Sequence, residues 1–344
     1  MCVIKPSGIS GRFFIYICRN FWIMRSIKGL VMAILSSATF GLIPLFSIPL
    51  MENPGDTSLE LNLDNVCFYR FLFSALLMGL VVFLKNLTSP EGEKGIKGAL
   101  KSSFGVTPKQ FLLLLLISVF YASTSIFLTA SYTIGEIPSG LATTMHFLYP
   151  VFVTAVMILF FGEKITWMKC VAVLLAFGGV YFLSGASFGG GTALNPLGLL
   201  FVLVTIFTYG SYIIGVNNIK PIASMNGMKL TFYVLAFSCL LFMCNILAKG
   251  GEFQSLTTFH QWWNILALAF IPTLISDLTL VYAIQLIGST TTAILGCMEP
   301  LTAVLVGIAV FGERLDANQG IGMILVFFAV YLVIAAQNKK EKAK

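Results

Sequence analysis

Charged residues are scarce in this sequence: they make up 10% of its 344 residues, whereas hydrophobic residues make up 58%. A soluble domain usually carries about 25% charged residues, so this chain has too little polar surface to coat a water-soluble globule. Apolar runs of about 20 residues, the length that crosses a bilayer as a helix, recur along the whole sequence. The short alternating strands of a transmembrane β-barrel are missing. The sequence therefore predicts an all-α polytopic protein whose surroundings are the lipid bilayer.

Histidine and paired cysteine are scarce as well. The only histidines are His146 and His260, and the seven cysteines show no CxxC pair and no Cys/His ligand spacing. These patterns support neither a disulfide framework nor a zinc site, so we predict no metal and no cofactor. Zincin, Walker A, nucleophile-elbow and kinase motifs are also missing. We therefore predict that the chain is not an enzyme and does not pump with ATP by itself.

The segment that organises the rest of the chain is residues 290–316, which contains an acid and a proline near the middle of an apolar run. When 150 is subtracted from each number, Pro300 falls on Pro150, and the Phe-Gly-Glu turn at 311–313 falls on the same turn at 161–163. A proline and a turn at one shared offset indicate an internal duplication. Inverted repeats are typical of secondary transporters, which bind substrate near the midplane between the repeats.

Ten spans are predicted, and the positive-inside rule tests that number. Their ranges are 27–50, 65–85, 108–131, 138–161, 166–184, 195–216, 227–248, 262–286, 290–311 and 318–336. With both termini in the cytoplasm, only Lys249 and Arg314 of the 21 basic residues fall in outer segments, and Arg70 lies inside a span. The net charge of +7 is thus explained by cytoplasmic loops, and we predict no nucleic-acid partner.

Five spans in each half make the second repeat inverted relative to the first. The predicted domains are a cytoplasmic N-terminal segment (1–26), a first five-helix repeat (27–184), a second five-helix repeat (195–336) and a basic cytoplasmic tail (337–344). The apolar run of the first segment is broken by Arg12 and Arg19, so it resembles neither a signal peptide nor a span. It is either an interfacial helix or an over-extended start, with translation beginning at Met24; we favour the latter.

The ordered set of features resembles the EamA family of the drug/metabolite transporter superfamily over residues 27–336. The features are the two five-helix units, Pro150 and Pro300 in the fourth helix of each, the Phe-Gly-Glu-basic turns, and Arg70 with Phe71 early in the second helix. The resemblance implies a bacterial inner-membrane exporter of amino acids, metabolites or drugs, with a central cavity and with the fifth and tenth helices supporting it. It supplies no substrate. We interpret Gly162, Glu163, Gly312 and Glu313 as turn residues.

Ionisable residues inside spans are costly and usually face a cavity or a partner. Glu299 shares a helix face with Gly296, and small side chains there leave space beside the carboxylate. The repeat-related positions are Tyr149 and His146, and Pro150 and Pro300 can each kink their helix. We predict that Glu299 binds a proton or a positively charged part of the substrate, with His146 nearby. The alternative is a structural acid paired with Arg70.

The other candidates lie on spans 2, 3, 6 and 8. Asp277 shares a polar face with Thr273 and Ser276 and is predicted to bind a base or a substrate amine. Arg70 is interpreted as structural, either snorkelling to the outer interface or bracing one of the acids. Hydroxyl stripes that contain Tyr121, Ser125 and Tyr212 line a polar pathway or join helices by hydrogen bonds.

We predict a secondary transporter that works by alternating access on a small-molecule substrate, with export as the favoured direction and protons as a candidate coupling ion. The alternative is a membrane-embedded enzyme or lipid-handling protein that uses Glu299, His146 and Asp277 as acid/base groups. The duplication and the midplane position of these residues favour transport. The substrate, the direction of transport, the coupling ion and the oligomeric state do not follow from the sequence.

Overall fold

The computed structural model describes residues 9–51, 60–88, 96–135, 145–164, 166–183, 195–310 and 317–342. Within these ranges every regular element is a helix. The elements are α1 (Ile9–Phe40), α2 (Ile43–Met51), α3 (Leu63–Leu87), α4 (Ile96–Phe104), α5 (Pro108–Thr133), α7 (Tyr149–Phe161), α8 (Trp167–Leu183), α9 (Pro196–Asn218), α10 (Lys220–Ala223), α11 (Gly227–Ala248), α12 (Phe259–Leu268), the π-helix η2 (Ala269–Ile275), α13 (Ser276–Ile287), α14 (Ser289–Leu295), α15 (Met298–Val310) and α16 (Ala317–Lys342).

Six helices in the described ranges are long and apolar enough to cross a membrane, so the protein is a multi-pass membrane protein. They are Met24–Met51, Leu63–Leu87, Pro108–Leu128, Pro196–Asn218, Gly227–Ala248 and Phe259–Ile287. Three shorter apolar helices are Tyr149–Phe161, Trp167–Gly179 and Gly320–Ala336. Each of these segments lies within or close to a predicted span. The arrangement of ten spans in two inverted repeats remains a prediction.

Local sequence signals explain where several helices begin. Asn62 accepts a hydrogen bond from the Asn65 amide at the start of α3. Thr107 forms a capping box with Gln110 at the start of α5, where Pro108 occupies the first turn. These side chains accept hydrogen bonds from amides that have no partner within the helix. A proline in the first turn removes no internal hydrogen bond, because the N–H groups of that turn are not used within the helix.

Several predicted features differ in the structure. The first span is interrupted at Gly41 and Leu42, between α1 and α2, and α1 already begins at Ile9. The connection near residues 86–107, between the second and third predicted spans, contains the amphipathic helix α4. Its buried residues are Gly98, Ala99 and Ser103, whose small side chains allow α4 to pack closely against α3.

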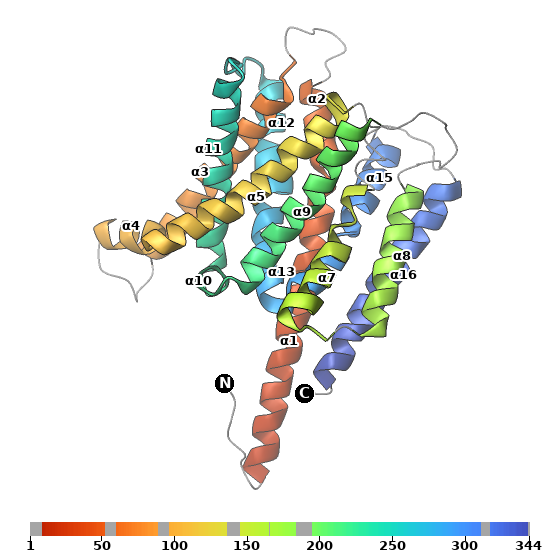
Figure 1. Ribbon diagram of the computed structural model, residues 1–344. Coiled ribbons are helices and arrows are strands. Elements are labelled where there is room, and N and C mark those ends of the chain that lie inside the picture. Colours follow the sequence, from red (N-terminus) through yellow and green to blue (C-terminus); the bar gives the residue numbers. More distant parts are fainter. Residues whose placement is uncertain are drawn as a thin grey trace.

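The helices form a bundle in which partners distant in sequence pack along each other (Figure 1). The main pairs are α1 with α13, α3 with α11, α5 with α9, and α8 with α16. Figure 1 shows the α8–α16 pair at one side of the bundle. A supporting role for the fifth and tenth spans stays a prediction. Phe71 and Phe242 stack inside the core with ring centroids 5.5 Å apart, and both side chains are buried.

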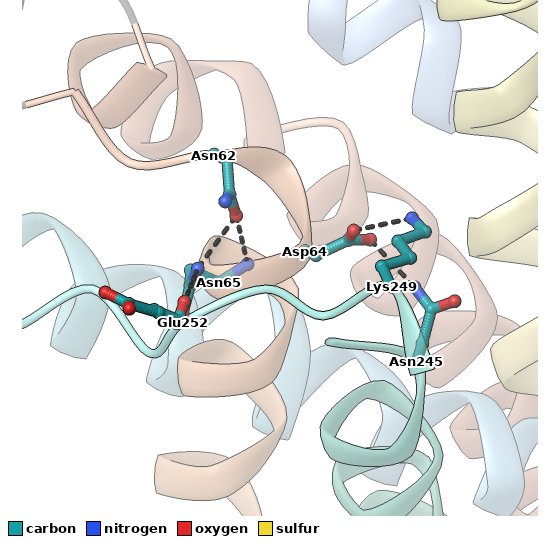
Figure 2. Close-up of polar contacts among 6 residues, drawn as sticks. All are labelled: Asn62, Asp64, Asn65, Asn245, Lys249 and Glu252. Atoms are coloured by element: carbon teal, nitrogen blue, oxygen red, sulfur yellow. Dashed lines mark hydrogen bonds and ion pairs between the residues drawn. The ribbon is translucent and has the colours of Figure 1, made fainter. Parts of the chain in front are cut away.

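A polar clasp joins the start of α3 to the connection between α11 and α12 (Figure 2). Lys249 pairs with Asp64 at 2.6 Å, and Asn245 donates to the same carboxylate at 3.0 Å. Asn65 donates to the Glu252 carbonyl oxygen at 3.2 Å. The clasp lies at one end of the α3–α11 pair, whereas α4 and α10 lie at the opposite end (Figure 1).

Candidate functional site

Two predicted spans are broken where their prolines occur, and both breaks contribute to the candidate site. In the fourth span, a turn at Phe147 and Leu148 precedes α7, and Pro150 lies in the first turn of that helix. In the ninth span, a turn at Gly296 and Cys297 separates α14 from α15. The expectation of one continuous helix at 290–311 is therefore wrong. Pro300 follows the break because the first turn of a helix tolerates the missing N–H group.

Asp277, on α13, is the most completely buried acid of the site, with 1% of its surface exposed. The Tyr121 hydroxyl on α5 donates a hydrogen bond to Asp277 Oδ1 at 2.6 Å. Among the described residues, no group hydrogen-bonds to Asp277 Oδ2. A buried carboxylate oxygen without a donor is costly, so this position is suited to a ligand that brings its own donor.

Aromatic rings continue from Asp277 toward the two helix breaks. Tyr121 packs against Tyr212 with ring centroids 4.8 Å apart, and Tyr209 packs edge-on against Tyr149 at 4.7 Å. Tyr209 and Tyr212 themselves stack at 6.3 Å, so the four rings form one continuous tyrosine cluster. The Tyr212 hydroxyl is buried and has no hydrogen-bond partner in the described part of the chain. The cluster therefore presents π-faces and one unused hydroxyl group.

Arg70, on α3, is buried rather than extended to an interface, so the snorkelling interpretation is wrong. Its Nε donates to Thr273 Oγ1 at 2.7 Å, and its guanidinium lies over the rings of Phe40 and Phe71 at 5.5 and 5.1 Å. The π-helix η2 presents Thr273 to Arg70, since the Thr273 hydroxyl also donates to the Leu268 carbonyl oxygen five residues back, at 2.8 Å. The remaining guanidinium N–H groups can serve an anionic group.

His146 lies just before α7, with its Nδ1 2.8 Å from Thr205 Oγ1 on α9. The Thr205 hydroxyl donates its single hydrogen to the Val202 carbonyl oxygen at 2.6 Å. Nδ1 must therefore be the donor toward Thr205, which leaves Nε2 of the neutral ring as an acceptor. His146 also packs against Tyr149 and Tyr209, so it belongs to the same group of residues.

The two helix breaks touch each other at Tyr149 and Gly296. The Tyr149 hydroxyl donates to the Ala293 carbonyl oxygen at 3.3 Å. A Cβ atom added at Gly296 would lie 1.9 Å from Tyr149 Oη, so only glycine leaves room for this contact. The small residue predicted to leave space beside Glu299 thus makes room for Tyr149 of the other broken span.

Glu299 lies in the first turn of α15 and is partly exposed. Its carboxylate is close enough to Tyr149 and Tyr209 for electrostatic interaction, and Arg70 lies within electrostatic range of both Glu299 and Asp277. Within the described ranges, no ion pair joins Arg70 directly to either acid. Those ranges also contain no group of three or more His, Cys, Asp or Glu side chains placed to hold a metal ion.

A sequence model of the EamA-like transporter family matches residues 27–185 and 196–335. The chain belongs to this family. Among similar proteins, an uncharacterized transporter of Archaeoglobus fulgidus is 26% identical over 288 residues, which cover 81% of this chain and 90% of that protein. The uncharacterized inner membrane transporter YedA of Escherichia coli K12 is 25% identical over 200 residues. That match spans 58% of this chain and 62% of YedA.

A solved crystal structure has a similar fold: it superposes on this chain with a TM-score of 0.70 at 15% sequence identity. The superposition covers 92% of this chain and 98% of that one. At this identity the likeness concerns the fold alone. Together with the family match, it places the described residues on an EamA-like helical scaffold.

The Phe-Gly-Glu turn of the first repeat forms a second polar cluster, which we call the latch: Glu163, Lys169, Thr290 and Thr291. Gly162 ends α7 in the left-handed conformation, with φ of 63°. Lys169 Nζ lies 3.7 Å from Glu163 Oε1 and 2.8 Å from Thr291 Oγ1, and Thr290 donates to Glu163 Oε2 at 2.7 Å. The latch joins α7 and α8 to the start of α14. Gly312 and Glu313 lie outside the described residues.

The structure thus brings together most of the predicted site residues. Tyr121, Tyr149, Tyr212, His146, Asp277, Gly296 and Glu299 lie in or beside the tyrosine cluster, whereas Ser125 is partly buried further along α5. Tyr209 is a member that we did not predict, although its spacing to Tyr212 and Thr205 places all three near one helix face. The positive-inside pattern predicts Lys169 at the cytoplasmic end of the span 166–184, and its side chain is buried in the structure.

Proposed function

We propose that this protein is a secondary transporter that exports small metabolites, such as amino acids or drug-like solutes, through alternating access between its two repeats. The unpaired oxygen of Asp277 beside the tyrosine cluster supports this proposal best. A solute with an ammonium group fits that position, because the ammonium donates to the carboxylate and its charge is attracted by the aromatic faces. Arg70 can bind the carboxylate of an amino acid, since its guanidinium has N–H groups beyond the one used by Thr273.

Two repeats of five spans, 27–184 and 195–336, fit this mechanism. The two stretches matched by the family, 27–185 and 196–335, support the same division of the chain. Discontinuous helices at the contact between repeats support it further, because transporters commonly bind substrate where helices unwind near the midplane. The contact between Tyr149 and Gly296 is such a meeting point.

We further propose that the protein lies in the bacterial inner membrane with both termini in the cytoplasm. The placement of lysine and arginine supports this orientation, as does an inner-membrane relative. Glu299 and Asp277 are the proposed proton carriers, each releasing its proton when the ammonium group of the solute binds. Impermeant thiol labelling in intact cells tests the orientation: Asp56→Cys should react and Lys97→Cys should not.

The experiment that tests the transport proposal is uptake by proteoliposomes of a mixed metabolite pool, with mass spectrometry of the captured solutes. Wild-type protein should accumulate one or more amines or amino acids unchanged. Asp277→Asn should reduce that transport about 100-fold, since losing a buried charge pair costs about 2–5 kcal/mol and 1.4 kcal/mol is tenfold. Asp64→Asn, which changes an acid of the distant clasp, is the matched control.

Two results would contradict the proposal. Equal transport by Asp277→Asn and wild-type protein, both eluting as monodisperse species, would remove Asp277 from the site. Recovery of a chemically altered solute would favour the membrane-embedded enzyme instead.

A further inference from the structure

A second place on the molecule lies between α3, α4 and α11, away from the tyrosine cluster. An apolar groove of about 520 Å³ runs there along the outside of the bundle. Its lining includes Leu76, Gly79 and Phe83 from α3, Leu100 and Phe104 from α4, and Phe232 from α11. A smaller pocket of about 190 Å³ adjoins it on the same three elements. This pocket is lined by Lys85, Asn86, Ser102, Asn226, Met228 and Lys229, besides Val82.

The two hollows are neighbours along the same helices. Phe83 of the groove and Asn86 of the small pocket are one turn apart on α3, and Phe232 and Lys229 are one turn apart on α11. α4 contributes Phe104 to the groove and Ser102 to the pocket. An elongated ligand with an apolar chain and a polar head therefore fits the pair of hollows better than a compact solute does.

The charge of the small pocket determines which charge the polar head group of a bound ligand must carry. Its two ionisable lining residues are both lysines, and no acid is among the lining residues. Among the described residues, the hydrogen-bond partner of Lys85 Nζ is the weakly accepting sulfur of Met228, at 3.6 Å. Lys229 donates to the carbonyl oxygens of Ser102 and Gly105, which uses two of its three N–H groups. N–H groups of both lysines therefore remain for an anion.

The opposite end of the same helix pair provides a contrast. There Lys249 of α11 finds Asp64 of α3 at 2.6 Å, so base and acid satisfy each other (Figure 2). At the α4 end, two bases meet, and the described residues that line the pocket include no acid. Two like charges in one pocket repel unless an external anion joins them.

We propose that this place is a binding site for an anionic phospholipid, with the phosphate held by Lys85 and Lys229 and an acyl chain lying in the groove. The exposed side of α4 supports a lipid rather than a soluble anion. It carries the apolar residues Ile96 and Leu100 beside Lys97 and Lys101, which is the composition of a helix lying at the membrane surface. The lipid would join α4 to α3 and α11.

Native mass spectrometry of the detergent-solubilised full chain tests this proposal. Phosphatidylglycerol should be retained at lower concentration than phosphatidylcholine with the same chains. Lys85→Gln should weaken phosphatidylglycerol binding about fivefold, because each lysine near an anionic lipid contributes about 1 kcal/mol. Lys109→Gln, an exposed lysine elsewhere on the same side, is the matched control and should change nothing.

Two further measurements separate the parts of the site. Ala236→Phe should narrow the groove and weaken both lipids, whereas Lys85→Gln should weaken only the anionic one. Equal retention of the two lipids by the wild-type protein would overturn the proposal, because the groove would then hold any annular lipid. Displacement of phosphatidylglycerol by glycerol phosphate at a similar concentration would also overturn it, since the pocket would then be a site for soluble phosphate.

Discussion

The two broken spans, which the predicted duplication relates to each other, differ in how their polar groups are satisfied. In the first, His146 bonds to Thr205 and Tyr149 bonds to the Ala293 carbonyl oxygen, so each candidate has a partner. In the second, Gly296 has no side chain, and no described side chain hydrogen-bonds to the Glu299 carboxylate. The first break therefore serves as a fixed wall, and the second presents a charge that a proton or ligand can satisfy.

Glu299→Gln should abolish this difference between the two breaks. Its effect on transport should be larger than the effects of the packing and latch substitutions described next. It keeps the shape of the side chain and removes the charge, so transport should fall about 100-fold if that charge contributes about 3 kcal/mol. Proteoliposome uptake between pH 5.5 and 8 is the measurement. Tyr149→Phe is the control at the related position, because it removes only a 3.3 Å hydrogen bond. Normal uptake by Glu299→Gln at every pH would make the acid structural.

Gly296→Ala should have the next largest effect, through packing. Its Cβ would lie 1.9 Å from Tyr149 Oη, and overpacking of a tight site costs about 1–3 kcal/mol. The midpoint of thermal unfolding in detergent should fall, and Tyr149→Phe in the same chain should restore part of it. The hydroxyl oxygen is then gone, whereas the Ala293 carbonyl oxygen, 2.9 Å from the added Cβ, remains. Gly320→Ala, which meets nothing within 4 Å, is the matched control. A double variant no better than Gly296→Ala would show that the two breaks are not in contact.

The latch adds a third, smaller difference between the repeats. At the positions 150 residues away, Thr290, Thr291 and Lys169 correspond to Gly140, Leu141 and Gln319, which cannot build the same cluster. Lys169→Met should loosen the latch by about 1 kcal/mol, the size of a hydrogen bond between membrane helices. Labelling of the buried Cys297 in a background without other cysteines should then accelerate about fivefold. The exposed Lys164, changed to Met, is the control; equal rates for both variants would contradict the role of the latch.

Much of the scaffold follows from composition, because lengths of apolar sequence and the placement of lysine predict spans without knowledge of contacts. Partners within the site are harder to predict, as the polar face of span 8 illustrates. The spacing of Thr273, Ser276 and Asp277 predicts one shared face, yet they bond to Arg70, Ser36 and Tyr121 on three different helices. The π-helical turn rotates these side chains relative to an ideal α-helix, and nothing in their spacing indicates it.

Long-range burial is equally hard to predict. Lys169 follows a loop in the sequence and has the position of a cytoplasmic base, but folding brings Thr291 to its amine from 122 residues away. Only the shared offset of the two repeats hints at the contact between Tyr149 and Gly296. Periodicity within one helix identifies the candidates, whereas their pairing depends on how the two halves of the chain meet.

The π-helix η2 has a consequence for how this chain tolerates changes in length. A π-turn holds about one residue more than an α-turn, and each residue advances the helix by about 100°. Asp277 faces Tyr121, and Thr273 faces Arg70, only while that additional residue is present. Loss of the codon for Pro272, the residue of η2 that has no backbone N–H, would leave an uninterrupted, well-bonded α-helix and turn the acid away from its tyrosine. In this segment a deletion that makes the helix more regular is the one that dismantles the site.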